Sequence, residues 1–256
     1  MANLEDNIIP DLIELTEKEK AILVHGGADE VTLVARRLGK EQRFITSPEG
    51  VRSRYTDEED IRIYTMVMAG LINKRIVSAL NHAGLSGVGI SGLDACTIRG
   101  SRRKRLIAID ERGRKVAVEG GYTGKIDSVD ARLINNIINN GYLPVISPLA
   151  IGQESEALNV DSDAAAAAVA VAVGADRLLF MTNVEGLQID GSLVRQIRVA
   201  DLNALFAKIG YGMNRKVIEA RRAIGNGVKE VIIAQSSIQR PILRAIRHEV
   251  GTVIQA

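Results

Sequence analysis

The stretch that most constrains the fold is residues 22–29, where an apolar run ends at two glycines and a helical pattern follows at once. The run is Ile22-Leu23-Val24-His25, and the glycines are Gly26 and Gly27. Such a run suits a strand that is buried on both faces, as in a parallel sheet. Glycines at its carboxyl end let the backbone approach an anion, and the amides that open the next helix face the same point. The stretch therefore predicts a strand, a glycine turn and a helix, with either anion binding or a plain tight turn at the glycines.

Strands and helices continue to alternate along the chain. Apolar runs predict strands at residues 87–90, 143–147, 178–182, 230–234 and 252–254. Helical spacing predicts helices at residues 3–15, 31–38, 57–82, 131–140, 162–174, 202–209, 213–224 and 241–247, with Thr56 as the cap of the longest helix and a break at Gly210-Tyr211-Gly212. Hairpins are expected around residues 110–114 and at Asp190-Gly191. This alternation predicts an α/β fold in which helices cover both faces of a mainly parallel sheet.

A boundary between two lobes fits best in the stretch from Ser147-Pro148 to Glu156. It predicts one lobe at residues 1–150 and a second at residues 151–256. The two lobes would share one continuous sheet and could form a single structural domain. A chain of 256 residues with 46% hydrophobic content can bury a core of that size.

Composition narrows the class of protein. No uninterrupted apolar stretch reaches the ~20 residues of a membrane-spanning helix, and the acidic residues Glu5, Asp6 and Asp11 make the amino terminus unlike a signal peptide. A cytoplasmic protein without a membrane partner is therefore predicted. The single Cys96 excludes an internal disulfide framework, and three scattered histidines make no recognisable metal cluster.

Positive charge is concentrated locally rather than globally. The net charge is only +2, but five basic residues lie close together: Arg99, Arg102, Arg103, Lys104 and Arg105. Aromatic residues make up 3% of the chain and leave little material for stacking on bases, so no nucleic-acid partner is predicted. The cluster is either a solvated turn, as runs of charge usually are, or a docking surface for an acidic protein.

Polar or glycine-rich sequences occur at four predicted strand ends: His25-Gly26-Gly27, Ser91-Gly92-Leu93-Asp94, Asn159-Val160-Asp161-Ser162-Asp163 and Thr182-Asn183-Val184-Glu185-Gly186. Ligands of parallel α/β sheets bind at that edge. Three further segments complete the pattern: residues 47–57, Gly120-Gly121-Tyr122-Thr123-Gly124-Lys125 and Gly212-Met213-Asn214-Arg215-Lys216. From residue 22 to residue 254 the combination resembles the amino acid kinase family, and within it the acetylglutamate kinase group.

The resemblance is closest to the archaeal and thermophilic branch that works on a carrier protein. It implies a three-layer αβα sandwich and an enzyme that uses ATP and Mg. In that branch the side-chain carboxylate of 2-aminoadipate or glutamate, whose amino group is blocked by an acidic amino-group carrier protein, becomes an acyl phosphate in lysine or arginine biosynthesis. A homodimer or larger assembly is also implied. A carboxylate with a pKa near ~4 is already an anionic nucleophile at neutral pH, so this chemistry needs no general base.

The resemblance assigns roles to residues of the substrate side. Gly26 and Gly27 would donate amides to the phosphoryl and substrate groups. Arg54 would bind the α-carboxylate of the substrate, and Asn159 its amide-linked end. Asp163 would orient the two catalytic lysines of the family. A surface arginine and an ordinary helix cap remain the plainer alternatives for Arg54 and Asp163.

The resemblance also assigns a nucleotide side and a docking surface. Lys216 would stabilise the transferring phosphoryl group, with a solvated helix lysine as the alternative. The nucleotide would be held by Thr182, Gly186, Gly212 and Met213. An acidic carrier would dock on Arg102, Arg103, Lys104 and Arg105.

The sequence departs from the family pattern at its start. Family members begin with a strand that carries Lys and Gly-Gly, before the helix expected here from Asn3, and this sequence shows no such segment. The pattern predicts either an internal methionine of a longer reading frame or a truncated and inactive relative, with the first favoured. Ala28 stands where the family usually has a third glycine, and Asn183 where it usually has aspartate.

Three functions follow as hypotheses. The first is an ATP-dependent kinase of carrier-bound 2-aminoadipate or glutamate. The second is an N-acetylglutamate kinase with the same chemistry on the free acetylated amino acid. The third, from another class, is a truncated carrier-binding protein without catalytic activity.

Overall fold

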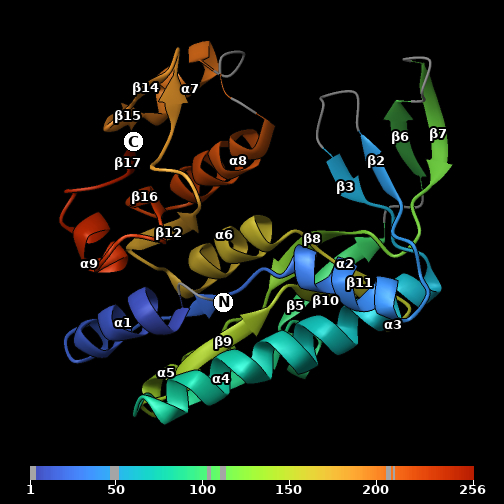
Figure 1. The fold of residues 1–256 in the computed structure, drawn as a ribbon, viewed down its shortest axis with the longest axis horizontal. Helices are drawn as coiled ribbons and strands as arrows, with labels where there is room; N and C mark the ends of the chain where they lie inside the picture. Colours follow the sequence, from blue (N-terminus) through green and yellow to red (C-terminus); the bar gives the residue numbers. More distant parts are fainter. Residues whose placement is uncertain (1–3, 47–51, 103–104, 110–113, 206–208, 210) are drawn as a thin grey trace. The chain divides into compact units, whose positions relative to one another are not determined.

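A computed structural model describes residues 4–46, 52–102, 105–109, 114–205, 209 and 211–256 (Figure 1). The chain forms two compact units, each built from separate segments. The terminal unit contains residues 1–21, 79–86 and 166–256, and the glycine-loop unit contains residues 22–78 and 87–165. The chain passes from one unit to the other after residues 21, 78, 86 and 165. The predicted lobes at residues 1–150 and 151–256, and their functions, stay predictions.

The terminal unit is built on a four-stranded sheet. Its strands lie in the order β12 (Arg177–Thr182), β16 (Glu230–Gln235), β17 (Thr252–Gln255) and β15 (Gln196–Arg198). The β12–β16 and β15–β17 pairs are parallel, whereas β16 and β17 are antiparallel. A two-stranded hairpin, β13 (Gln188–Ile189) and β14 (Ser192–Leu193), accompanies them. The predicted strands at 178–182, 230–234 and 252–254 are confirmed, and the sheet is mixed.

Strand β16 shows why this unit has helices on two sides. Val231 and Ile233 belong to the larger apolar cluster, with side chains of α6 (Ser162–Val173), α7 (Val199–Leu205) and α8 (Tyr211–Gly225). Ile232 and Ala234 point the other way, into a second cluster with Ala245 of α9 (Pro241–Ile246). Successive side chains of a strand alternate between faces, so burial of both sets requires cover on both faces. The layered arrangement predicted from the strand–helix alternation is confirmed.

The glycine-loop unit contains two larger sheets and two hairpins. The first sheet is parallel, with β9 (Leu143–Ser147) between β1 (Leu23–Val24) and β4 (Gly87–Ser91). The second has the order β11 (Ala157–Asn159), β10 (Leu149–Ile151), β5 (Ile98–Arg102) and β8 (Gly124–Val129). The hairpins are β2 (Phe44–Thr46) with β3 (Arg52–Arg54), and β6 (Arg105–Ile109) with β7 (Lys115–Glu119). The helices are α2 (Ala28–Arg37), α3 (Glu58–Thr65), the π-helix η2 (Met66–Ile72), α5 (Arg132–Asn139) and the 3-10 turn η3 (Asp94–Cys96). Helix α4 (Asn73–His82) begins in this unit, and its residues from Ala79 onward belong to the terminal unit.

Helix α3 begins with a capping box that corrects one prediction. Asp57, rather than Thr56, is the N-cap residue: its side chain accepts a hydrogen bond from the Asp60 amide, and the Asp60 side chain accepts one from the Asp57 amide. Asp57 also pairs with Lys40, whose Nζ lies 2.6 Å from Oδ2. The carboxylates at 57–60 sit at the positive end of the helix and stabilise its start.

The helical run Glu58–His82 is long and apolar enough, by length and composition, to cross a membrane. It is not an uninterrupted apolar stretch, because it contains charged residues such as Asp60, Arg62 and Lys74. Its apolar side chains are used inside the unit, because Ile61, Val67, Met68 and Ile72 are buried. The same signal is common in core helices of soluble proteins, so it carries no argument for a membrane span.

The remaining differences concern short or polar elements. Strands β2, β3, β5, β8, β10, β11 and β15 were not predicted. Tyr211 and Gly212 lie within α8 and do not break it, and α7 begins at Val199 rather than near Leu202. The predicted loop at residues 47–50 and most of the turn at 110–114 lie outside the described residues.

Candidate functional site

The glycine loop follows β1 and leads directly into α2, as the sequence predicts. Gly27 is the N-cap residue of α2. A methyl group built on Gly26 would lie 3.5 Å from Ser162 Oγ, so the loop is next to the first residue of α6. Two helix amino termini and a glycine turn therefore come together in the glycine-loop unit. Backbone amides at such termini favour an anion.

Gly27 is packed so closely that a larger residue would displace neighbouring side chains. A Cβ at this position would lie 2.1 Å from Ile72 Cδ1 and 3.0 Å from Met68 Sδ. Both side chains belong to the π-helix η2, and both are buried. The glycine turn thus lies directly on η2. π-helical segments are frequent at functional sites, and this one supports the loop.

His25 is buried beneath the turn and is 7% exposed. Its Nδ1 lies 3.0 Å from the Gly26 carbonyl oxygen, and its Nε2 lies 3.0 Å from Ser147 Oγ. Burial lowers the pKa of His25 below its usual value, and the bond to Gly26 opposes this only in part. A neutral imidazole in such a polar network does more than pack at the end of the strand.

Asp163 is the second residue of α6, and the helix cap is provided by another residue. Asp161 Oδ1 accepts a hydrogen bond of 3.0 Å from the Ala164 amide. The plain cap role that the sequence left open for Asp163 is therefore filled by Asp161. The Asp163 carboxylate lies in the first turn, where the helix dipole stabilises a negative charge.

Asn159 ends β11 and is oriented by Thr56. Its Nδ2 donates a hydrogen bond of 2.9 Å to Thr56 Oγ1, and its backbone pairs with Thr123. Thr123 Oγ1 is buried and has no hydrogen-bond partner among the described residues. A buried hydroxyl without a partner is costly, so it is a candidate contact for a polar ligand group. The sequence had placed Thr123 only within the Gly120–Lys125 segment.

Arg54 is buried and held by other parts of the glycine-loop unit. Its Nη2 donates to the Ala28 carbonyl at 2.8 Å and to Thr32 Oγ1 at 2.9 Å, and its Nη1 donates to Gln42 Oε1. It is 7% exposed, and burial lowers its pKa. The alternative of a surface arginine is wrong. Direct binding of a substrate carboxylate stays a prediction.

Lys216 lies on α8, in the terminal unit. Its Nζ is 5.3 Å from the ring centroid of Phe180, a residue of β12. Phe180 is two residues before Thr182, so the lysine lies close to the carboxyl-terminal part of that strand. Met213 packs against the larger apolar cluster, and Gly212 lies in the first turn of the same helix. Two of the residues predicted to hold the nucleotide, Gly212 and Met213, therefore lie on the same helix as Lys216.

The loop after β12 is fixed by Thr252. Leu187 donates its amide to Thr252 Oγ1 at 2.8 Å, and Thr252 Oγ1 donates to the Val194 carbonyl at 2.5 Å. A Cβ on Gly186 would lie 2.6 Å from that same oxygen, which explains a glycine at this position. Thr182 ends the strand, and its carbonyl accepts from both the amide and the hydroxyl of Ser236.

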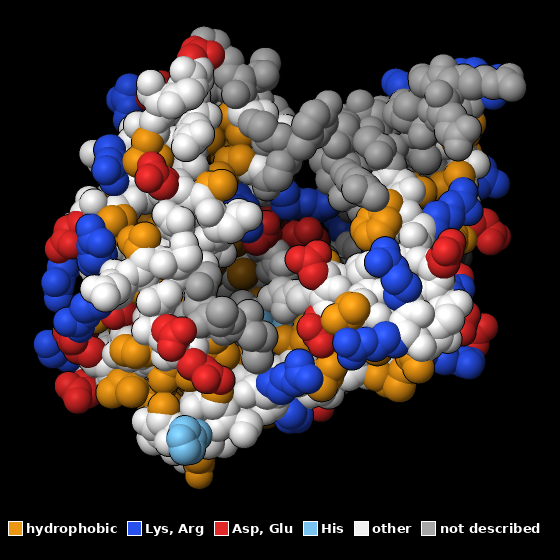
Figure 2. Space-filling model, viewed as in Figure 1, with side chains coloured by type: hydrophobic (Ala, Val, Ile, Leu, Met, Phe, Trp, Pro, Cys, Tyr) orange, Lys and Arg blue, Asp and Glu red, His pale blue; other side chains and the backbone are white. Residues whose placement is uncertain are grey.

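The basic cluster is only partly described, because Arg103 and Lys104 lie outside the described residues. The Arg102 side chain makes two contacts within its own unit. Its Nε donates to the Gly121 carbonyl, and its guanidinium lies 4.3 Å from the centroid of the Tyr122 ring. Arg105 is exposed at the start of β6. Figure 2 shows basic side chains mixed with acidic ones over the visible face.

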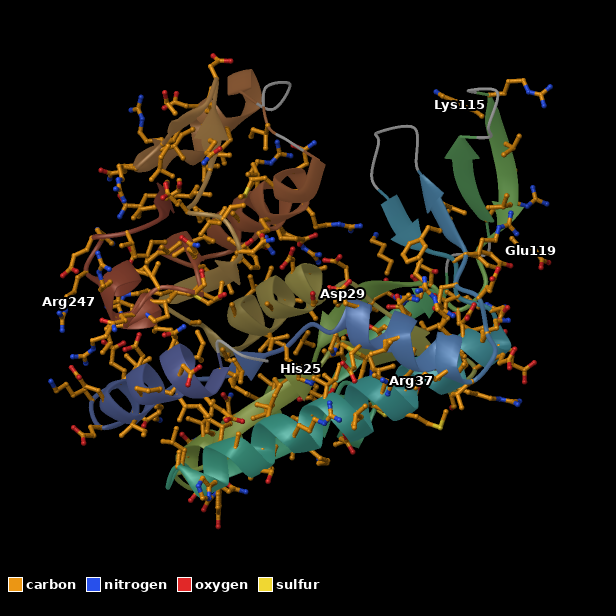
Figure 3. The ribbon with its side chains drawn as sticks, in the orientation of Figure 1. His25, Asp29, Arg37, Lys115, Glu119 and Arg247 are labelled. Atoms are coloured by element: carbon orange, nitrogen blue, oxygen red, sulfur yellow. The ribbon has the colours of Figure 1, made fainter. Side chains whose placement is uncertain are left out.

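Hairpin β6–β7 has an exposed face made of five residues: Arg105, Ile107, Lys115, Ala117 and Glu119. Ile107 is 57% exposed. Figure 3 shows Lys115 and Glu119 at the two ends of β7. We call these five residues the hairpin face. Within the part of the chain that the structure describes, no group of three or more His, Cys, Asp and Glu side chains could hold a metal ion.

Sequence reasoning missed several residues that position the site. Thr56 appears in it only as a helix cap, and Asp161 and Thr252 only as parts of longer segments. The partners of Thr56 and His25 come from distant parts of the sequence, Asn159 for Thr56 and Ser147 for His25. The signal that could have found His25 is a histidine placed directly before the two glycines.

The model of the amino acid kinase family matches residues 2–235. A protein of Saccharolobus solfataricus named LysW-aminoadipate/LysW-glutamate kinase is 43% identical over 98% of this chain and 94% of its own length. A protein of Nitrosopumilus maritimus with a provisional form of that name is 47% identical over 99% of this chain and 95% of its own length. The solved structure of N-acetylglutamate synthase from Neisseria gonorrhoeae has a TM-score of 0.81 at 21% identity, over 100% of this chain and 56% of that one.

Proposed function

Since the chain belongs to the amino acid kinase family, we propose that it transfers a phosphoryl group from ATP to the side-chain carboxylate of carrier-bound 2-aminoadipate or glutamate. The chain is a kinase, as the names of its full-length relatives indicate. The carrier and the acyl phosphate product are the proposed part. They are supported by the words LysW-aminoadipate and LysW-glutamate in the name of a relative at 43% identity.

The observation that carries the proposal is the glycine loop beside the first turn of α6. The nucleophile is a carboxylate and the donor is a polyphosphate, so the protein must hold two anions and offset charge on the group that moves. Backbone amides from the loop and from two helix amino termini contribute to both tasks, and no general base is needed. The donated electron pair comes from the carboxylate oxygen, and the bond from phosphorus to the leaving oxygen of ATP breaks.

On the substrate side, we assign Gly26 and Gly27 as amide donors to the phosphoryl and carboxylate groups. Asn159, held by Thr56, presents its side-chain carbonyl to the amide-linked end of the substrate. Asp163 orients cationic groups at the transferring phosphoryl group and removes no proton. Arg54 adds a buried positive charge next to the start of α2, which attracts the α-carboxylate.

On the nucleotide side, we assign Lys216 as the cation that offsets charge on the transferring phosphoryl group. Thr182, Gly186, Gly212 and Met213 are proposed to hold the nucleotide. Magnesium would be carried by the phosphate oxygens of ATP, since Mg²⁺ is usually bound through substrate phosphates and few protein ligands, and there it would neutralise negative charge.

The hairpin face is our candidate docking surface for the carrier protein. It presents Arg105 and Lys115 around the exposed Ile107. Basic residues speed the approach of an acidic partner, and an exposed apolar residue among them adds contact area. Arg102, which is held against Gly121 and Tyr122, stays a predicted docking residue, as do Arg103 and Lys104.

The test is an assay of ATP consumption with three acceptors: carrier-bound 2-aminoadipate, carrier-bound glutamate and free N-acetylglutamate. Hydroxylamine in the mixture converts an acyl phosphate to a hydroxamate, which is measured directly. We expect hydroxamate with one or both carrier-bound substrates. Hydroxamate with the free acetylated amino acid alone would instead establish an N-acetylglutamate kinase. Carrier binding without turnover of any acceptor would establish a non-catalytic binding protein.

A further inference from the structure

Three buried polar side chains lie beneath the glycine loop. His25 Nε2 lies 3.0 Å from Ser147 Oγ and 3.3 Å from Asn73 Nδ2. Asn73 and Ser147 are completely buried, and a Cβ on Gly89 would lie 1.9 Å from Asn73 Oδ1. Buried polar groups are costly unless they are satisfied, so an apolar core would be the simpler solution here. The network therefore requires a reason beyond packing.

The hydrogen bonds determine which nitrogen of His25 carries the proton. Asn73 Nδ2 donates to the Val145 carbonyl at 2.9 Å. The nitrogen of the Asn73 side-chain amide, rather than its oxygen, therefore faces the imidazole ring. Nε2 of His25 must then be the acceptor, since two donors cannot face each other. Ser147 can also donate to it or to the Met68 carbonyl at 3.1 Å. The proton of the neutral ring is consequently on Nδ1, which donates to the Gly26 carbonyl.

That bond fixes the orientation of one peptide group. The peptide between Gly26 and Gly27 is planar and trans, so its N–H points opposite to its C=O. With the carbonyl held by the imidazole, the Gly27 amide points away from the ring. A peptide between two glycines can rotate easily because neither residue has a Cβ. Rotation would replace the amide by a carbonyl oxygen, which repels an anion.

We propose that His25 is a positioning residue that locks the Gly26–Gly27 peptide with the Gly27 amide directed towards the anionic group that the loop binds. This inference rests on the proposed phosphoryl transfer for the identity of the anion. The lock itself depends only on the network of His25, Asn73 and Ser147. His25 touches no reacting atom and acts through the glycine peptide.

The experiment uses two matched variants of the whole protein. In His25→Asn, the side-chain nitrogen takes the place of Nδ1 and keeps a donor for the Gly26 carbonyl. In His25→Gln, the side chain reaches the place of Nε2 and leaves that carbonyl without its partner. Both variants remove the ring, so they share any loss of packing, which thermal unfolding measures. The readouts are the amide resonance of Gly27 and kcat/KM with carrier-bound 2-aminoadipate.

We expect the Gly27 resonance of His25→Asn to stay close to that of the unmodified protein, with kcat/KM within about threefold. For His25→Gln we expect a shifted or broadened resonance and kcat/KM lower by about 10- to 100-fold, less than the loss of a whole oxyanion donor. Equal behaviour of the two variants would show that the ring only packs. If the unmodified protein turns over no acceptor, the proposed function fails. The Gly27 resonance then still tests whether His25 fixes the orientation of the Gly26–Gly27 peptide.

A second measurement needs no substitution. The nitrogen chemical shifts of His25 in the unmodified protein show which ring nitrogen carries the proton. We expect a protonated Nδ1 and a bare Nε2. A proton on Nε2 would leave the Gly26 carbonyl without its donor and would overturn the proposal.

Discussion

Lys216 places its ammonium group 5.3 Å from the centroid of the Phe180 ring, and the residue is half-buried. We predict that Lys216→Met lowers kcat by about 10²- to 10³-fold, because a cation aimed at developing charge acts mainly in the transition state. KM for ATP should change much less. Steady-state kinetics with carrier-bound substrate measures both quantities.

The matched control for that substitution is Lys229→Met. Lys229 has a side chain that is 78% exposed and pairs with Asp176 at 2.6 Å. We expect kcat to stay unchanged in this variant. A similar loss of kcat in both variants would argue against a special role for Lys216. Thermal unfolding accounts for the contact with Phe180, which is worth about 0.5–2 kcal/mol.

Ala95 is a non-glycine residue in a left-handed turn, with φ 50°, and Cys96 follows with φ 54°. The left-handed conformation costs a residue with a Cβ about 1–2 kcal/mol. Glycine avoids that cost, but it loses more conformational entropy on folding, which lowers stability by about 0.5–1 kcal/mol. We predict that Ala95→Gly stabilises the protein by about 0.5–1 kcal/mol. Urea unfolding measures the change, and a loss of stability would show that the methyl group makes a valuable contact.

The buried ring of His25 makes stability depend on pH. Its pKa is lowered by burial, so below about pH 6.5 the unfolded chain binds a proton that the folded chain does not. Stability from this group is complete above that pH, and it falls as pH decreases towards the folded pKa, by at most about 1.4 kcal/mol per pH unit. We predict a steeper loss between pH 7.5 and 5 for the unmodified protein than for His25→Asn. Parallel unfolding curves would contradict the neutral buried ring.

Helix α1 (Ile9–Thr16) is linked to α9 through the buried carboxylate of Asp11. Asp11 is 0% exposed, and its Oδ2 accepts from the amides of Ile242 at 2.7 Å and Leu243 at 3.1 Å. These are orphan donors at the start of α9, so Asp11 acts as a cap from a distant part of the chain. Arg240 Nε lies 3.5 Å from the other oxygen.

We predict that Asp11→Ala destabilises the protein by about 2–4 kcal/mol, because it leaves two buried amides without an acceptor. Hydrogen exchange in α1 should increase with it. Glu14→Ala is the control on the same helix: Glu14 pairs with Arg240 at the surface, and its loss should cost less than about 1 kcal/mol. Equal costs for the two variants would mean that Asp11 contributes only charge.

Long elements with a clear period were predictable, and short polar ones were not. The helix at 57–82 and the strand at 143–147 follow from apolar patterns alone. Strands such as β3, with Arg52-Ser53-Arg54, and β15, with Gln196-Ile197-Arg198, contain too few apolar residues to show a period. They exist because a partner strand pairs with them, and pairing between distant segments cannot be read from local sequence.

For the whole molecule, the sequence predicts the fold class correctly, and the two compact units are interleaved along the chain. Residues 1–21 and 79–86 form a compact unit with 166–256, through contacts such as Asp11 with Ile242. Such long-range contacts leave no mark in composition near residue 150. The candidate site shows the same limit. The glycine turn was predictable because two glycines follow an apolar run. The buried partners of Arg54 and His25 were not, because they depend on tertiary packing.

The hairpin face is the proposed docking surface for an acidic carrier protein. On the hairpin face, Arg105 and Lys115 surround the exposed Ile107. If an acidic carrier docks there, Arg105→Glu should raise KM for carrier-bound substrate several-fold and leave kcat nearly unchanged, since rim charges act mainly on association. The dependence of KM on salt should also become weaker, because one attractive charge is gone.

The matched control is Arg62→Glu, which reverses an equally basic charge on α3. The Arg62 side chain is 72% exposed and pairs with Glu58 within the same helix, away from the hairpin in sequence. It changes the net charge by the same amount, so a general charge effect would appear in both variants. An effect on KM that is equal in the two variants would therefore assign attraction to the overall charge. A larger effect in Arg105→Glu, with KM for ATP unchanged, would assign docking to the hairpin face itself.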